Sequence, residues 1–165
     1  MHIVLYQPEI PQNTGNIART CAATGTTLHL VEPLGFSLSD KYLKRAGLDY
    51  WHLLDVHVHR DFASFLGAFP GVRIYYASTK AKQDYAQVTY EDRDVLVFGP
   101  ETRGLPENLL ADEYDRTIRI PMLENARSLN LSNAVAVVLY EALRQQGFPQ
   151  LAKRGVLRQG REIYG

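Results

Sequence analysis

Short hydrophobic runs along this chain alternate with stretches in which hydrophobic positions recur every three or four residues. The runs are typical of buried strands, and the periodic stretches are typical of helices. Strands are predicted at 2–7, 27–32, 54–59, 72–78, 95–99 and 117–121. Helices are predicted at 14–25, 39–47, 61–69, from near 105, and at about 129–146. Because the two kinds of element alternate, the pattern predicts an α/β fold: a mainly parallel sheet with helices on both faces.

The last predicted helix is hydrophobic on more than one side. Its apolar positions are Leu131, Val135, Val138, Leu139 and Ala142, with Ala134, Ala136 and Val137 between them. One apolar stripe is enough to dock a helix on a core. A second apolar side indicates either a central place in the core or a subunit interface, and the pattern favours neither over the other.

Length and composition limit the class of protein. A chain of 165 residues, 45% of them hydrophobic, is expected to form one compact domain over 1–165 with a short basic tail at about 149–165. The sequence has neither a signal-peptide pattern nor an apolar run of membrane-spanning length, so we expect a cytoplasmic protein with no membrane partner. Cys21 is the one cysteine. An intramolecular disulfide is therefore impossible, and no metal site is expected.

Charge is balanced overall, with 18 basic and 18 acidic residues, but it is unevenly distributed. Acidic side chains predominate from 84 to 115. Basic side chains gather in three places: Lys41, Lys44 and Arg45; Lys80 and Lys82; and Lys153, Arg154, Arg158 and Arg161 in the tail. These groups either form ordinary solvated surface or contact the phosphates of a nucleic acid.

Three polar clusters follow predicted strands, at the edge where open α/β sheets bind their ligands. The first is NTGNIAR at 13–19, in which Asn13 is a plausible helix N-cap. Arg19 stands among small and apolar residues, where a guanidinium needs an anionic partner.

The second cluster is FGPETRGLP at 98–106, a strand that runs into a turn with glycine at both ends. Leu105 and Pro106 stand where a phosphate-binding loop requires Lys and then Ser or Thr, so that type of site is excluded. The glycines allow a ligand to approach the backbone closely, and Glu101 supplies one carboxylate. An ordinary strand-to-helix turn would explain the same pattern.

The third cluster begins with IPM at 120–122 and continues with SLNLSNA at 128–134. Its hydroxyl and amide side chains crowd the start of the last helix, where a single N-cap would need only one of them. The group predicts a polar cradle at the positive end of a helix.

These three motifs, in this order and spacing over residues 1 to about 148, closely resemble those of the SPOUT superfamily of RNA methyltransferases. The chain is most similar to the short subgroup that methylates the wobble nucleotide of tRNA. The resemblance implies a deep C-terminal trefoil knot, a homodimer through the C-terminal helix, and S-adenosyl-L-methionine (AdoMet) as cofactor without a metal. It also implies tRNA as partner and 2′-O-methylation at nucleotide 34, cytidine or carboxymethylaminomethyluridine, of leucine tRNAs.

The resemblance further implies which residues form the site. Arg19, Asn13, Glu101 and Asn130 fall on catalytic positions. The AdoMet pocket falls on Ala77, Gly99, Ile120, Met122, Ser128 and Leu129. A guanidinium is normally always charged, so we expect Arg19 to anchor a phosphate and lower the pKa of the ribose hydroxyl; literal proton abstraction would need unusual help. The amides of Asn13 and Asn130 would orient this network, and Glu101 would fix local backbone or Arg19.

Two other classes of function are weighed against this one. A catalytically silent RNA-binding module would not need so many polar groups at strand ends, and an NAD- or nucleotide-binding enzyme lacks its glycine fingerprints here. Cys21 and the pair Tyr75 and Tyr76 are interpreted as packing residues. His57 and His59 share one face of a strand but do not complete a zinc site.

Overall fold

The computed structural model describes residues 1–39, 41 and 53–156. The helix predicted at 39–47 lies largely outside these residues, as do Lys44, Arg45, Arg158 and Arg161.

A parallel sheet of seven strands forms the centre of the described chain. Its strands are β1 (His2–Tyr6), β2 (Thr27–Val31), β3 (Val56–His59), β4 (Ile74–Ala77), β5 (Gln83–Asp84), β6 (Val95–Phe98) and β7 (Thr117–Arg119). They lie in the order β3-β2-β1-β6-β4-β7-β5, and each adjacent pair is parallel. The predicted fold class is confirmed, and it brings the carboxyl ends of all these strands to one edge.

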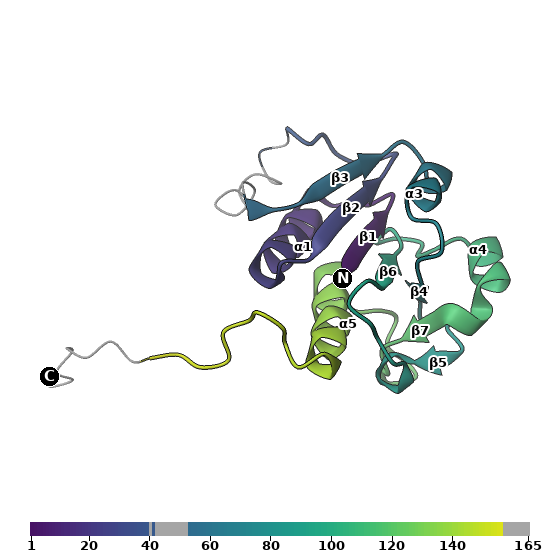
Figure 1. Cartoon of the computed structure of the whole chain (residues 1–165). Helices are drawn as coiled ribbons and strands as arrows, with labels where there is room; N and C mark the ends of the chain where they lie inside the picture. Colours follow the sequence, from purple (N-terminus) through teal and green to yellow (C-terminus); the bar gives the residue numbers. More distant parts are fainter. Residues whose placement is uncertain (40, 42–52, 157–165) are drawn as a thin grey trace, which may run out of the picture.

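Helices cover both faces of this sheet (Figure 1). Their bounds are α1 (Pro11–Thr24), α3 (Phe62–Ala68), α4 (Glu107–Asp112) and α5 (Leu131–Gln145). One hydrophobic cluster joins α1 and α5 to the sheet through Ile17, Cys21 and Leu139. A second cluster joins α3 and α4 to the opposite face through Phe65 and Leu110. Side chains of a strand alternate between faces, so each central strand contributes to both clusters.

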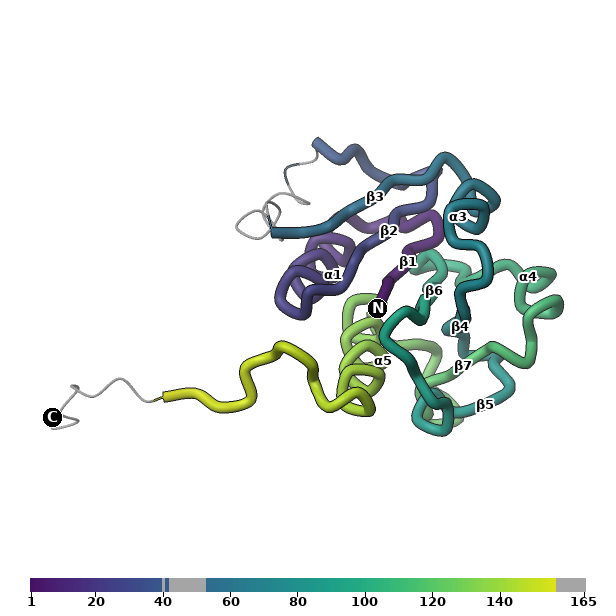
Figure 2. The backbone as a smooth tube through the Cα atoms, in the orientation of Figure 1, coloured from purple at the N-terminus to yellow at the C-terminus, as the bar shows by residue number. Residues whose placement is uncertain are grey.

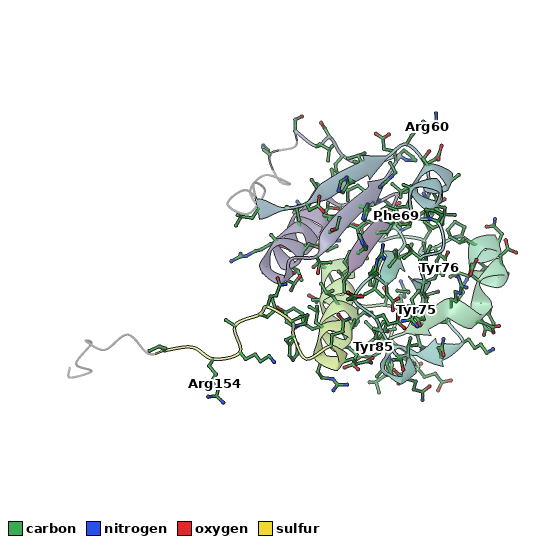
Figure 3. All side chains as sticks on the ribbon, viewed as in Figure 1. Arg60, Phe69, Tyr75, Tyr76, Tyr85 and Arg154 are labelled. Carbon is green, nitrogen blue, oxygen red and sulfur yellow. The ribbon has the colours of Figure 1, made fainter. Side chains whose placement is uncertain are left out.

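The packing interpretations of three residues are confirmed. Cys21 is fully buried, and burial raises the pKa of its thiol to about 12. Tyr75 and Tyr76 are also buried, and Figure 3 shows both on the central sheet. A protonated, enclosed thiol is a poor nucleophile, so Cys21 serves as a small core residue.

Two element predictions differ from the structure. The acidic connector after 78 contains β5 and a 3₁₀ helix at Tyr85–Gln87, which no hydrophobic run indicated. Helix α1 begins at Pro11, three residues before the predicted start, so the interpretation of Asn13 as an N-cap was wrong. Proline is well suited to the first position of a helix because its fixed φ is already helical.

Residues 146–156, which follow α5, turn and then lead away from the sheet without forming a helix or strand (Figure 2). Phe148 and Leu151 still pack against the core, whereas Arg154, labelled in Figure 3, lies away from it. The deep C-terminal knot stays a prediction.

Three histidines form a hydrogen-bonded row across β1, β2 and β3. The Nε2 atom of His29 lies 3.0 Å from Nδ1 of His2, and its Nδ1 atom lies 3.0 Å from Nε2 of His59. The ring of His29 is 1% exposed and contacts Phe65 and Phe69. His57 stacks on the same ring and contacts Asp55. Burial lowers the pKa of His29 to about 3, with the neighbouring histidines acting in the same direction.

This row predicts a loss of stability in acid. The pKa of His29 lies below its value of 6.5 in the unfolded chain, so the unfolded state binds the proton first as pH falls. The contribution of His29 is complete above about pH 6.5 and is lost toward pH 3, at a slope approaching 1.4 kcal/mol per pH unit. We expect His29→Gln to flatten the pH dependence of the free energy of unfolding in urea titrations. His57→Gln removes an exposed ring that also helps to lower the pKa of His29, so it should change the slope less than His29→Gln does. Equal slopes for wild type and His29→Gln would contradict the prediction.

Candidate active site at the carboxyl ends of the strands

A cavity of about 570 Å³ opens at the carboxyl ends of β4, β6 and β7. The loops after these strands form most of its wall, and the starts of α1 and α5 complete it. Ligand pockets in proteins typically measure about 300 to 1,000 Å³. The cavity is therefore large enough for a nucleoside-sized ligand.

Nine of the ten predicted site residues line this cavity. From the cofactor set they are Ala77, Gly99, Ile120, Met122, Ser128 and Leu129, and from the catalytic set Asn13, Glu101 and Asn130. The structure thus brings together residues separated by more than a hundred positions in the sequence. Their roles in binding and catalysis stay predictions.

Arg19 is the exception, since it is not among the described residues that line the cavity. Its side chain is exposed on α1. It lies six positions after Asn13, which corresponds to about 9 Å along a helix and about 120° around its axis. Arg19 therefore faces away from the cavity that Asn13 lines.

The loop after β6 folds back closely on its own strand. Gly104 donates its backbone N–H to the carbonyl of Pro100 at 3.0 Å and has a φ of +69°. A Cβ atom on Gly99 would overlap the backbone nitrogen of Leu105 and lie 2.9 Å from the Cα of Gly104. Glycine is therefore required at 99 for space and favoured at 104 for conformation.

Glu101 binds the beginning of α1. Its carboxylate accepts hydrogen bonds from the backbone N–H groups of Glu9 at 2.8 Å and Ile10 at 3.1 Å. It also accepts one from the side-chain amide of Asn13 at 3.2 Å. The N-cap residue Ile10 has no side-chain cap of its own, so this carboxylate supplies the acceptor and the negative charge that a helix N-terminus favours. Of its two expected roles, Glu101 performs the fixing of backbone.

Asn130 links α1 to α5. As N-cap of α5, its Oδ1 accepts from the backbone N–H of Ser132 at 2.9 Å and from that of Asn133 at 3.4 Å. Its Nδ2 donates to Oδ1 of Asn13 at 3.0 Å. Asn13 is only 6% exposed, so its amide is held in one orientation by Asn130 on one side and Glu101 on the other.

Some residues of the wall were not predicted. Ile10, Thr79 and Thr102 also line the cavity. The one signal in the sequence that could have predicted this is that each follows a strand, where open α/β sheets bind their ligands. Lys80, expected to contact phosphate, also lies there but forms an ion pair with Glu107, and Lys82 pairs with Asp115. Exposed pairs of this kind are weak, so the lysines can still exchange a carboxylate for a phosphate.

Within the described ranges, no group of three or more His, Cys, Asp and Glu side chains could hold a metal ion. In the same ranges, no helix is long and apolar enough to cross a membrane.

Comparison with known proteins places this arrangement in a family. A model of the SpoU rRNA Methylase family matches residues 1–140. The chain belongs to this family. The tRNA (cytidine(34)-2′-O)-methyltransferase of Escherichia coli K12 is 53% identical over 150 residues, which cover 90% of this chain and 96% of that protein.

Solved structures of the family share the fold. One, from work on the 2-OH methylation of C/U34 on tRNA, has a TM-score of 0.85 and 53% identity, and the match covers 88% of this chain and 95% of the other. The SpoU methyltransferase AviRb from Streptomyces viridochromogenes, in complex with AdoMet, has a TM-score of 0.78 at 25% identity. That match covers 88% of this chain and 60% of AviRb. Methyltransferases of this family therefore bind AdoMet on this fold.

Proposed function

We propose that this protein transfers a methyl group from AdoMet to the ribose 2′-oxygen of nucleotide 34 in tRNA. The observation that carries the proposal is the network of Glu101, Asn13 and Asn130 in the wall of the cavity. Cytidine or carboxymethylaminomethyluridine at this position of leucine tRNAs is the proposed target. The likeness to relatives that modify C34 or C/U34 supports the nucleotide, and we expect the reaction to take place in the cytoplasm.

The residues of the cavity fit AdoMet. Ile120, Leu131 and Val138 provide apolar wall, and Gly99 lines the cavity while the space beside its Cα is taken by the backbone of Gly104 and Leu105. Ser128 adds a hydroxyl to the wall. When bound, AdoMet supplies a methyl group already activated on a sulfonium. The protein then has to bring the ribose oxygen into line with that methyl group and assist loss of the hydroxyl proton.

The held amides of Asn13 and Asn130 are suited to orienting the substrate. Each is held by hydrogen bonds to other groups of the protein, so its orientation is set before a substrate enters. Such preorganised dipoles need no rearrangement during the reaction. Glu101 acts indirectly: it binds the start of α1 and so fixes the position of Asn13.

A homodimer through α5 is the second part of the proposal. The inner side of α5 packs in the core through Val135, Val138 and Leu139, whereas Val137 and Tyr140 on its outer side are 37% and 46% exposed. The apolar outer side is available for a second copy. Figure 1 shows α1 beside α5 on the same face of the sheet, so a partner docked on α5 also approaches α1. In this arrangement Arg19, which faces away from its own cavity, serves the cavity of the partner subunit.

Mass spectrometry tests the reaction. Unmodified leucine tRNA is incubated with the protein and labelled AdoMet, digested with nuclease, and mapped. We expect one methyl group on the ribose of nucleotide 34, a nucleotide in a single-stranded loop that can enter a pocket without melting a duplex. Label on a base, or at a ribose outside the anticodon loop, would overturn the assignment. Titrations with AdoMet, NADH and ATP test the two rival classes, and only AdoMet should bind.

Sedimentation tests the dimer. We expect a dimer at micromolar concentration and a shift to monomer in Tyr140→Glu, which places a charge in the proposed interface. Glu113→Gln, on the surface near Arg116, should leave the dimer intact. A fully active monomer of the wild type would contradict the proposal.

A further inference from the structure

Two loops that follow neighbouring strands are tied to each other by a pair of carboxylates. Residues 7–10 follow β1, residues 99–104 follow β6, and the two strands are paired. Glu101 of the second loop accepts hydrogen bonds from the backbone of Glu9 and Ile10 in the first. In return, Glu9 accepts from the backbone N–H of Thr102 at 3.1 Å and from its hydroxyl at 2.8 and 3.0 Å. Each loop therefore provides the acceptor for the other.

Further contacts hold the first loop in place. Gln7 accepts a hydrogen bond from the guanidinium of Arg103 at 2.8 Å. Gly35 donates its backbone N–H to the carbonyl of Pro8 at 2.9 Å, and a Cβ atom on Gly35 would lie 2.8 Å from the Cα of Glu9. The backbone of Glu9 is thus packed against Gly35. This contact fixes the position from which the Glu9 side chain extends toward Thr102.

Glu9 differs from Glu101 in its relation to the cavity. Thr102 and Glu101 line the cavity, but Glu9 is not among the described residues that do. The carboxylate of Glu9 is therefore connected to the cavity through its hydrogen bonds to Thr102, in the loop at 99–104. That loop carries Gly99, whereas Asn13 lies on α1, which directly follows the first loop.

We infer that Glu9 is a positioning residue for methyl transfer: through Thr102 it holds the loop at 99–104 in a fixed position relative to Asn13. The inference rests on the proposed function. A carboxylate is suited to the task because both of its oxygens accept, which matches the N–H and O–H that Thr102 presents. A glutamine keeps one acceptor oxygen for the N–H, but its NH2 group would make the Thr102 hydroxyl turn and accept, and the stronger hydrogen bonds to a charged carboxylate would be lost. Because in-line transfer depends on placement to within about 1 Å, loosening this tie should affect turnover more than binding.

The experiment compares Glu9→Gln with wild type in two independent measurements. In methylation assays at saturating substrates, we expect kcat to fall about tenfold or more while the AdoMet Kd, from calorimetry, changes less than about threefold. In hydrogen–deuterium exchange on the protein without ligand, we expect faster exchange of the amides at 99–104. The melting temperature should fall by only a few degrees, as for a part-exposed hydrogen bond.

Two more variants make the test specific. Thr102→Val removes only the hydroxyl, so it should reduce kcat less than Glu9→Gln does, and combining the two should cost less than the sum of their separate effects. Glu113→Gln is the matched control, because this carboxylate also faces a partner, Arg116 at 3.7 Å, but does not line the cavity. It should leave kcat and exchange at 99–104 unchanged.

The outcomes separate the inference from the function on which it rests. Unchanged kcat in Glu9→Gln, or a raised Kd with full turnover at saturation, would overturn the positioning role. Unchanged exchange at 99–104 would show that Glu9 does not hold the loop. Absence of methylation at nucleotide 34 by the wild type would instead refute the proposed function, and with it the link to methyl transfer.

Discussion

Replacement of Arg19 by alanine is expected to lower turnover by about a hundredfold or more while AdoMet affinity stays within a few fold. The magnitude is that of losing a group that assists proton removal and stabilises developing charge. AdoMet affinity should persist because Arg19 does not line the described cavity of its own chain. Single-turnover methylation of leucine tRNA, with calorimetry of AdoMet binding, measures both quantities. Loss of AdoMet binding with turnover retained at saturation would reverse the assignment.

A mixture of two inactive variants tests whether Arg19 acts across the dimer. Arg19→Ala and Asn13→Ala chains are mixed, unfolded and refolded together. If Arg19 serves the partner's cavity, each mixed dimer contains one intact site, and random pairing restores about a quarter of wild-type activity. If Arg19 serves its own cavity, both sites of the mixed dimer are defective and no activity returns. Each variant refolded alone is the control.

Substitution of Gly99 by alanine is expected to weaken AdoMet binding by about ten- to a hundredfold. The added Cβ atom would overlap the backbone of Gly104 and Leu105, and backbone cannot rotate aside as the end of a side chain can. The loop must shift, and overpacking of this kind costs about 1 to 3 kcal/mol. Calorimetric titration with AdoMet measures the change.

Gly67→Ala is the matched control for this substitution. Gly67 lies within α3, a Cβ atom there would meet nothing within 4 Å, and its backbone is not in the left-handed region. Alanine at 67 should keep AdoMet affinity and raise helix stability by up to about 1 kcal/mol. Equal AdoMet affinity of Gly99→Ala and wild type would show that the loop tolerates the added atom, and would remove the steric explanation for glycine at 99.

Local pattern was sufficient to predict the parallel sheet and the helices on its two faces. All four residues of β6, Val95–Phe98, are apolar and buried. A strand that is covered on both faces typically appears in the sequence as a continuous apolar run. The start of α1 was misjudged because its N-cap residue, Ile10, has no side-chain cap and its N–H is bound by Glu101, 91 positions away; the local sign of this start was Pro11. β5 was missed for a related reason: its two residues, Gln83 and Asp84, pair with β7 through backbone alone.

For the site as well, the sequence indicated some features and only the tertiary structure decided the others. The three motifs contain Asn13, Gly99, Glu101 and Asn130, but helix caps and ordinary turns would explain these residue types, and it was the resemblance to a methyltransferase family that assigned them to a site. Only the tertiary structure decided which of them contact each other, since hydrogen bonds such as that from Asn130 to Asn13 join residues 117 positions apart. It also decided that Arg19 faces away from the cavity and that Glu9 is tied to Thr102. Which side of α1 faces the cavity, and which loops meet, depend on how the elements pack, and the order of residues in the chain does not specify either.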